Sequence, residues 1–190
     1  MQGIVDRILD QPRFNGKLIN RAGEGTRDPM EIRYMILARY AEYSPDGKLT
    51  LIGGDIEKYV WDEFPVVQPI LFAATRLVLN REDTRTSHRF KSMIQNADGE
   101  TIAEGIESTI HDFEMPPDTT QLGAGLILSF AGVVYPKPGW YKMVLSIDNE
   151  VSKEAPYRVM ARDEEKALEA AVMKAYQEKD DGRHIDNDDQ

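Results

Sequence analysis

From residue 32 to residue 162 the apolar positions follow the short alternation of β-strands, and turn-forming residues interrupt them every 8 to 15 residues or so. The pattern predicts eight or nine strands, at 32–43, 49–54, 70–79, 87–95, 101–105, 107–113, 122–135, 140–150 and 155–162. No helical pattern separates these segments. The predicted fold class is therefore all-β, an antiparallel sandwich or barrel rather than a sheet with crossover helices.

Turn chemistry marks several of the predicted connections. The stretches SPDGK and NADGE each carry Asp-Gly at the tip, which is typical of a hairpin. The stretch PKPG opens a strand in which Tyr141, Met143 and Leu145 alternate towards one face. The strand at 70–79, by contrast, is apolar on both faces at its centre, as expected for a strand between two layers.

The pattern changes to that of a helix after residue 161. Asp163 is placed as the N-cap, two glutamates follow in the first turn, and one face carries an apolar stripe. The stripe consists of Leu168, Ala171, Val172, Ala175 and Tyr176. A helix of this length is marginal alone in water, so we expect it to pack on its own domain, on a second copy or on another protein.

The predicted domains are an N-terminal arm and linker at 1–29, a sandwich at 30–161, a helix at 162–178 and an acidic, disordered tail at 179–190. The arm has the short amphipathic stretch GIVDRILDQPRF followed by a polar linker with Gly and Pro. Met30 stands directly before the first strand, so either Met1 or Met30 fits as the first residue of the protein.

Composition narrows the classes of function. The 190 residues carry a formal net charge of −10, which argues against nucleic acid and anionic membrane surfaces as partners. The chain contains no cysteine, which excludes disulfides, cysteine-ligated metals and thiol catalysis, and fits a reducing cytoplasm. No stretch resembles a signal peptide or a membrane span. A soluble cytoplasmic protein that binds proteins, or copies of itself, is expected.

Few residues suggest chemistry. The best candidate metal ligands are His111, Asp112 and Glu114, although neighbouring strand residues point to opposite faces, so His111 and Asp112 need a bulge to meet one ion. A solvated acidic strand end explains this stretch more simply. Ser87 and His88 are adjacent and so are poorly placed as nucleophile and base. We predict no catalytic residues and no cofactor.

The connection at 55–69 is the most aromatic surface candidate. It carries Tyr59, Trp61 and Phe64 among acidic residues. Tyr and Trp are frequent anchors of interfaces, because they bury a large area at a low entropic cost. The alternative, which we favour, is that Trp61 and Phe64 cap one end of the sandwich core. The binding residues predicted here are Tyr59, Trp61, Phe64, Leu168, Val172 and Tyr176.

Two long stretches, YMILARYAEYSPDGKLTLIGGDIEKYVWDEFP and FAGVVYPKPGWYKMVLSIDNE, resemble a family of small bacterial single-domain proteins known only as a domain of unknown function. The resemblance covers about residues 30 to 160. It implies an immunoglobulin-like β-sandwich, but it brings no activity and no catalytic residues.

The leading functional hypothesis is thus a non-enzymatic protein-binding or assembly module of unknown pathway. One alternative is a small metal-dependent hydrolase that uses the acidic/His cluster at His111. Another is a structural subunit of a phage or other large assembly, in which sandwiches with arms are common.

Overall fold

The computed structural model describes residues 30–81, 83–110 and 115–181, which form nine strands, one short 3-10 helix and one α-helix. The strands are β1 (Glu31–Tyr43), β2 (Leu49–Gly54), β3 (Lys58–Trp61), β4 (Val66–Asn80), β5 (His88–Asn96), β6 (Thr101–Ile110), β7 (Gln121–Tyr135), β8 (Gly139–Ile147) and β9 (Glu150–Ala161). The helices are η1 (Asp83–Arg85) and α2 (Arg162–Asp181).

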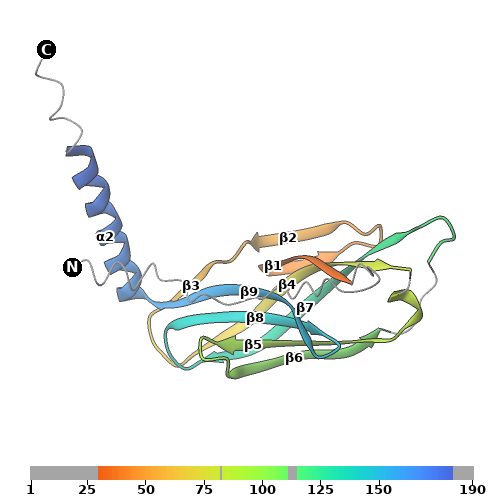
Figure 1. Ribbon diagram of the computed structural model, residues 1–190. Helices are drawn as coiled ribbons and strands as arrows, with labels where there is room; N and C mark the ends of the chain where they lie inside the picture. The colour runs from red at the N-terminus through yellow and green to blue at the C-terminus, as the bar shows by residue number, and fades with distance from the viewer. Residues whose placement is uncertain (1–29, 82, 111–114, 182–190) are drawn as a thin grey trace, which may run out of the picture.

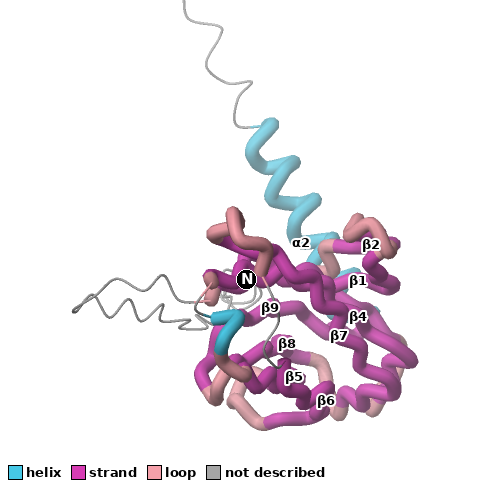
Figure 2. The backbone as a smooth tube through the Cα atoms, turned by 90° about the vertical axis from the view of Figure 1, so that its right-hand side faces the viewer, coloured by secondary structure: helices cyan, strands magenta, loops and turns pink. Residues whose placement is uncertain are grey.

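The strands form two sheets that pack face to face in a sandwich-like body (Figure 1), and Figure 2 shows the same layers after a quarter turn. The four-stranded sheet has the order β2-β1-β4-β7, and the five-stranded sheet has the order β3-β9-β8-β5-β6. Every pairing between these strands is antiparallel except that of β3 with β9. The predicted all-β class with a C-terminal helix is confirmed at this level.

The core lies between the two sheets and is made by alternate residues of the long strands. Its large, fully buried side chains come from both layers and include three tyrosines, namely Tyr135, Tyr141 and Tyr157, beside Leu71, Leu77, Leu128, Ile94, Met143 and Leu145. Packing of this kind supplies most of the stability of a domain.

Strand β1 changes direction near its middle. Its pairing with β4 ends at Ala38, and its pairing with β2 begins at the same residue. Tyr34 and Tyr43 are nine residues apart, which is roughly 30 Å along a straight strand. Their hydroxyl oxygens nevertheless lie only 3.3 Å apart. The β1–β2 hairpin therefore turns back over the sheet to which it belongs.

The returning hairpin covers part of the outward face of β4 and β7. The ring of Tyr43 occupies the space above Gly125, where a Cβ atom would lie 2.4 Å from it. The hydroxyl of Tyr43 donates a hydrogen bond to the carbonyl of Thr75 at 2.9 Å. On the same outward face, Ala74 and Val78 are 0% and 6% exposed.

The observed elements differ from the predicted ones in four places. The turn between the last two strands lies at Asp148 and Asn149, so β8 ends at Ile147 rather than at residue 150 and β9 begins at Glu150 rather than at residue 155. The connection at 55–69 contains strand β3, and β4 begins at Val66 rather than at residue 70. The two short strands predicted on either side of residue 106 form a single strand, β6, as far as Ile110. The helix continues to Asp181, three residues beyond its predicted end, since no helix breaker occurs before Gly182 in the sequence.

Candidate interaction site

Helix α2 follows β9 without an intervening loop and is held at its base by two ion pairs. Nζ of Lys58 in β3 lies 2.7 Å from a carboxylate oxygen of Glu165. Nε of Arg162 donates a hydrogen bond to Asp62, which follows β3. The hydrogen bond from Arg162, together with its charge, lowers the pKa of the Asp62 carboxyl below its usual value. These contacts tie the first turn of the helix to the edge of the five-stranded sheet.

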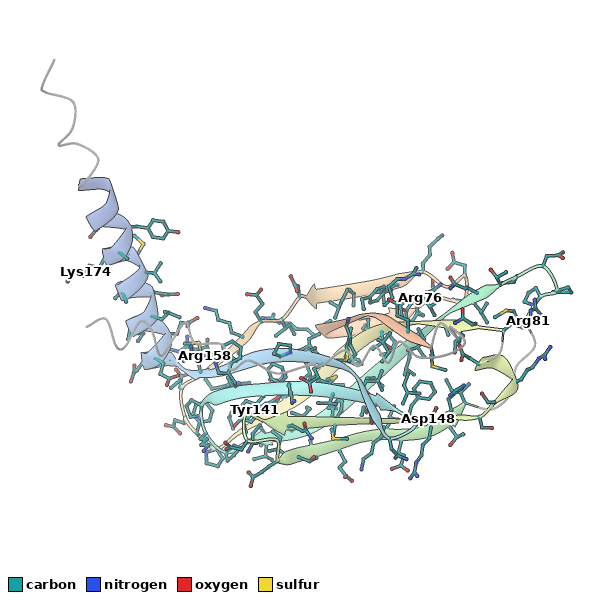
Figure 3. The ribbon with its side chains drawn as sticks, viewed as in Figure 1. Arg76, Arg81, Tyr141, Asp148, Arg158 and Lys174 are labelled. Carbon is teal, nitrogen blue, oxygen red and sulfur yellow. The ribbon has the colours of Figure 1, made fainter. Side chains whose placement is uncertain are left out.

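Beyond its first turns the helix projects away from the sandwich (Figures 1 and 2), and its contacts with strands are those with β3 and β9 near its base. Figure 3 places Lys174 on the side of α2 that faces away from the sandwich. On the apolar stripe, Leu168 and Ala171 are half-buried, whereas Val172 is 42% exposed and Tyr176 is 70% exposed. The stripe predicted from the sequence is thus presented to solvent.

The aromatic residues predicted at 55–69 lie at the end of the sandwich near the base of α2. Tyr59, Trp61 and Phe64 are all half-buried and pack against the core. The ring of Tyr59 meets that of Tyr157 edge-on, with 6.2 Å between their centroids. The structure therefore places these side chains as a cap on the core, which is the second of the two interpretations above. Their role as binding anchors stays a prediction.

Two polar atoms in this cap have no hydrogen-bond partner among the described residues. They are the hydroxyl of Tyr59 and the indole Nε1 of Trp61. A buried polar group without a partner is costly, typically by about 1–3 kcal/mol. The aromatic cap therefore leaves two buried hydrogen-bonding groups without a partner among the described residues.

His88 belongs to a small polar cluster that resembles a nucleophile, a base and an orienting acid. Its Nδ1 lies 2.8 Å from Oδ2 of Asp148, and its Nε2 lies 3.0 Å from Oγ1 of Thr86. The same Nε2 lies 3.1 Å from the carbonyl oxygen of Asp83, which can only accept a hydrogen bond. In the tautomer with its proton on Nε2, the ring donates to this carbonyl and cannot act as a base towards Thr86.

The hydrogen bonds of this cluster hold two strands together, and we call it the histidine clamp. Asp148 also accepts a hydrogen bond from the backbone N–H of Arg89 at 2.9 Å. Asp148 and Asn149 both have positive φ values, 54° and 69°, as a tight hairpin turn requires. The cluster joins the start of β5 to the turn between β8 and β9, so we assign it a structural role.

The predicted metal ligands His111, Asp112 and Glu114 lie outside the described residues. Within the ranges that the structure describes, no group of three or more His, Cys, Asp or Glu side chains is placed to hold a metal ion. In the same part of the chain, no helix is long and apolar enough to cross a membrane.

Sequence reasoning missed a second exposed apolar surface, on the outward face of the four-stranded sheet. The register pairs Val67 with Val134 on this face, and Ile70 lies three residues further along β4. Tyr40 and Ile52 pair with each other in the β1–β2 hairpin that covers the neighbouring part of the face. These five side chains are 39% to 60% exposed. We call them the apolar sheet patch. The predicted strand at 70–79 is apolar on both faces and so indicated an apolar outer face. The sequence pattern does not show which part of that face the rest of the chain covers.

The comparisons with known proteins identify the family. A model described as "Family of unknown function (DUF6941)" matches residues 33–160. The chain belongs to this family. The match spans the sandwich and leaves α2 outside, and it confirms the resemblance to an uncharacterised domain family. A search of curated proteins finds no match to the sequence of this DUF6941 chain.

Solved structures resemble the DUF6941 chain only distantly. The Pseudomonas fluorescens alkylpurine DNA glycosylase AlkC, bound to DNA containing an abasic site analog, aligns with 9% identity and a TM-score of 0.38. The alignment covers 70% of this chain and 30% of the glycosylase. A glycosyl hydrolase family 2 member from Bacteroides cellulosilyticus aligns with 17% identity and a TM-score of 0.30, over 52% of this chain and 14% of the hydrolase. At these TM-scores the likenesses say nothing about function.

Proposed function

We propose that the chain is a non-enzymatic protein-binding module that docks on a protein partner through the apolar stripe of α2. The observation that carries this proposal is the position of the helix. It is tied to the sandwich by two ion pairs at its base, while Val172 and Tyr176 remain 42% and 70% exposed further along. A helix that lays such a stripe into an apolar groove is a recurrent mode of recognition.

Energetics support a partner for this helix. An isolated helix shorter than about 12–15 residues is marginal in water even when rich in alanine, and a helix of 20 residues with a mostly polar surface gains little more. Burial of a Val or Leu side chain is worth about 1.5–3 kcal/mol. Covering Leu168, Val172 and Tyr176 would therefore stabilise the helix and contribute binding energy at the same time.

The charge of the chain supports a protein as the partner. The formal net charge is −10, and the first turn of α2 carries Asp163, Glu164 and Glu165. Phosphate groups would be repelled by such a surface. A bacterial source and a cytoplasmic location belong to the same proposal. The family resemblance supports the first, and the absence of cysteine supports the second.

We further propose that the sandwich is of the immunoglobulin-like type. Strands β4 and β7 lie in one sheet and β9-β8-β5-β6 in the other, which is the order of B and E opposite G, F, C and C′ in that fold. Tyr141, near the start of β8, donates its hydroxyl to the carbonyl of Lys137 at 2.8 Å. This contact corresponds to the tyrosine corner near the start of strand F. The type matters because such sandwiches commonly serve as scaffolds for binding.

The test uses a photo-crosslinking amino acid in cells that produce the protein. p-Benzoylphenylalanine is placed at Val172, on the stripe, and in a second protein at Gln177, which lies on the opposite side of the helix by its 100° spacing. We expect a discrete protein cross-link from position 172 that is absent or much weaker from position 177. Equal cross-linking from both positions, or none from position 172, would contradict the proposal.

A further inference from the structure

The outward face of the four-stranded sheet is unusually apolar for a surface in contact with water. Antiparallel sheets with one face in solvent normally alternate apolar residues towards the core with polar residues outwards. Here the sequence contains no charged residue at 66–75 or at 126–135, which pair with each other in β4 and β7; the next charged residue along β4 is Arg76, which pairs with Gly125. In a chain with 29% charged residues, this face is composed like an interior layer.

One part of this face is already covered from within the chain. The β1–β2 hairpin lies over it, since Tyr43 packs on Gly125, and Ala74 and Val78 on this face are buried. The hairpin does not cover the part of the face formed by the start of β4 and the end of β7. There Ile70, Val67 and Val134 remain 39%, 54% and 49% exposed. The apolar sheet patch thus continues a buried layer without a cover of its own among the described residues.

The size of the patch is that of an interface. Its five partly exposed side chains, three on β4 and β7 and two on the hairpin beside them, add up to roughly 400 Å² of exposed surface, which is in the range of the largest patches on ordinary monomers. Covering a patch of this size once would bury less than the roughly 1,200 Å² that a stable interface needs, whereas two equivalent contacts related by a twofold axis would reach it.

The same chain carries a second exposed apolar surface of similar length, the stripe of α2. From Leu168 to Tyr176 the stripe is about 12 Å long at 1.5 Å per residue. On the sheet, the distance along β4 from Val67 to Ile70 is roughly 10 Å at 3.3 Å per residue. A helix laid on a sheet is a standard way for both elements to bury their apolar faces.

Charge favours the same pairing. The exposed Arg39 lies beside the patch, with its side chain against Gly53 in β2. The first half of α2 carries an excess of acidic residues, including Glu169 next to the stripe. Two helices paired with each other would leave both sheet patches uncovered.

The contacts at the base of α2 indicate whether its stripe packs on the sheet of its own chain or on that of another copy. The pairs Lys58–Glu165 and Arg162–Asp62 hold the first turn against β3, and the helix then leaves the sandwich (Figure 1). Folding back onto its own four-stranded sheet would break both pairs. Resting on the function proposed above, we propose that α2 of one copy seats its stripe on the apolar sheet patch of a second copy, and that the contact is reciprocal.

The chain lacks cysteine, so single cysteines report proximity without background. Purified full-length Val172→Cys is mixed with differently tagged Ile70→Cys and oxidised mildly. We expect the mixed disulfide to be the main dimer and to form at least tenfold faster than with Gln177→Cys in place of Val172→Cys. Ile52→Cys provides a second acceptor position, in case the change at Ile70 disturbs its strand.

Other products would overturn the inference. Dominant 172–172 or 70–70 disulfides would indicate helix–helix or sheet–sheet contacts instead. A monomer closed by its own disulfide, in the double variant Ile70→Cys/Val172→Cys, would show that the helix folds back on its own sheet. If no 70–172 disulfide forms while position 172 still photo-crosslinks to a different protein, this inference fails and the proposed function stands. If neither cross-link forms, both fail.

Discussion

The buried pair of tyrosine hydroxyls offers a quantitative test of how the core is held together. The hydroxyls of Tyr135 in β7 and Tyr157 in β9 lie 2.7 Å apart, and both residues are 0% exposed. Burial raises the pKa of Tyr157 far above its ordinary value, so both hydroxyls keep their protons at neutral pH. One donates to the other, and the bond links the two sheets through the core.

Removing one hydroxyl leaves the other buried without its partner. Such a group costs about 1–3 kcal/mol, whereas removing both groups of a buried pair is nearly neutral. We therefore expect Tyr135→Phe and Tyr157→Phe each to lower the free energy of unfolding by about 1–3 kcal/mol. The double variant should be more stable than the sum of the two losses implies, and at least as stable as either single variant.

The assay is urea unfolding followed by the fluorescence of Trp61 and Trp140, with linear extrapolation to water. A double-variant loss equal to the sum of the two single losses would refute the reasoning, because it would show that the two hydroxyls do not depend on each other. The slope of the transition should stay the same in all four proteins, since none of the changes alters the surface exposed on unfolding.

Two further predictions concern the hairpin cover and the histidine clamp. Gly125→Ala places a methyl group in the space of the Tyr43 ring and should lower the free energy of unfolding, measured in urea, by about 1–3 kcal/mol. Gly139→Ala is the control, because its added Cβ meets nothing closer than 3.9 Å, and it should lower the free energy of unfolding clearly less. Equal losses in the two variants would contradict the packing of the hairpin on the sheet. Burial raises the pKa of Asp148, but the hydrogen bonds from His88 and from the neighbouring backbone N–H outweigh it, so its net pKa lies below the ordinary 3.8. A carboxyl with a lowered pKa stabilises the fold above its unfolded pKa and loses this contribution as the pH falls through its folded pKa. Asp148→Asn should therefore be less stable than the wild type at pH 7 and equal to it near pH 2, and a stability difference that does not change with pH would count against the clamp.

Much of the fold could be predicted from the alternation of apolar residues alone. The long strands and the two Asp-Gly hairpin turns follow from local chemistry, and so does the helix, whose acidic first turn is visible in the sequence. The turn at Asp148 and Asn149 carries no such signal, and the predicted strand at 140–150 runs through it. Strand β3 could not be predicted in the same way. It has four residues, and it exists because β9, about a hundred residues later, pairs with it in parallel. Local pattern carries no information about such a partner.

Glycine explains another difference. Gly105 suggested a break between two short strands, yet it lies within β6. A Cβ there would lie 2.4 Å from Oγ of Ser92 and 2.5 Å from the ring of Phe130. The residue is small because the other layer approaches closely, not because the strand ends. A glycine in the sequence can therefore mark either the end of a strand or a close approach of another layer, and only the packing shows which.

The candidate site was predictable on the helix and not on the sheet. The spacing of Leu168, Val172 and Tyr176 indicates a stripe whatever the rest of the chain does. The apolar sheet patch depends instead on the bend of β1 at Ala38, which determines how far the hairpin covers β4. That bend is a property of tertiary packing, so the sequence shows an apolar strand without showing which end of it stays exposed.

The mass of the purified chain in solution, measured by light scattering after size exclusion, shows most directly whether the stripe of α2 carries an interface that a second copy occupies. Wild type and Gln177→Glu should both run at about twice the chain mass of 21.6 kDa, while Val172→Glu, which places the same charge on the stripe, should run as a monomer. If Val172→Glu keeps the mass of the wild type, the claim that copies join through this stripe is contradicted.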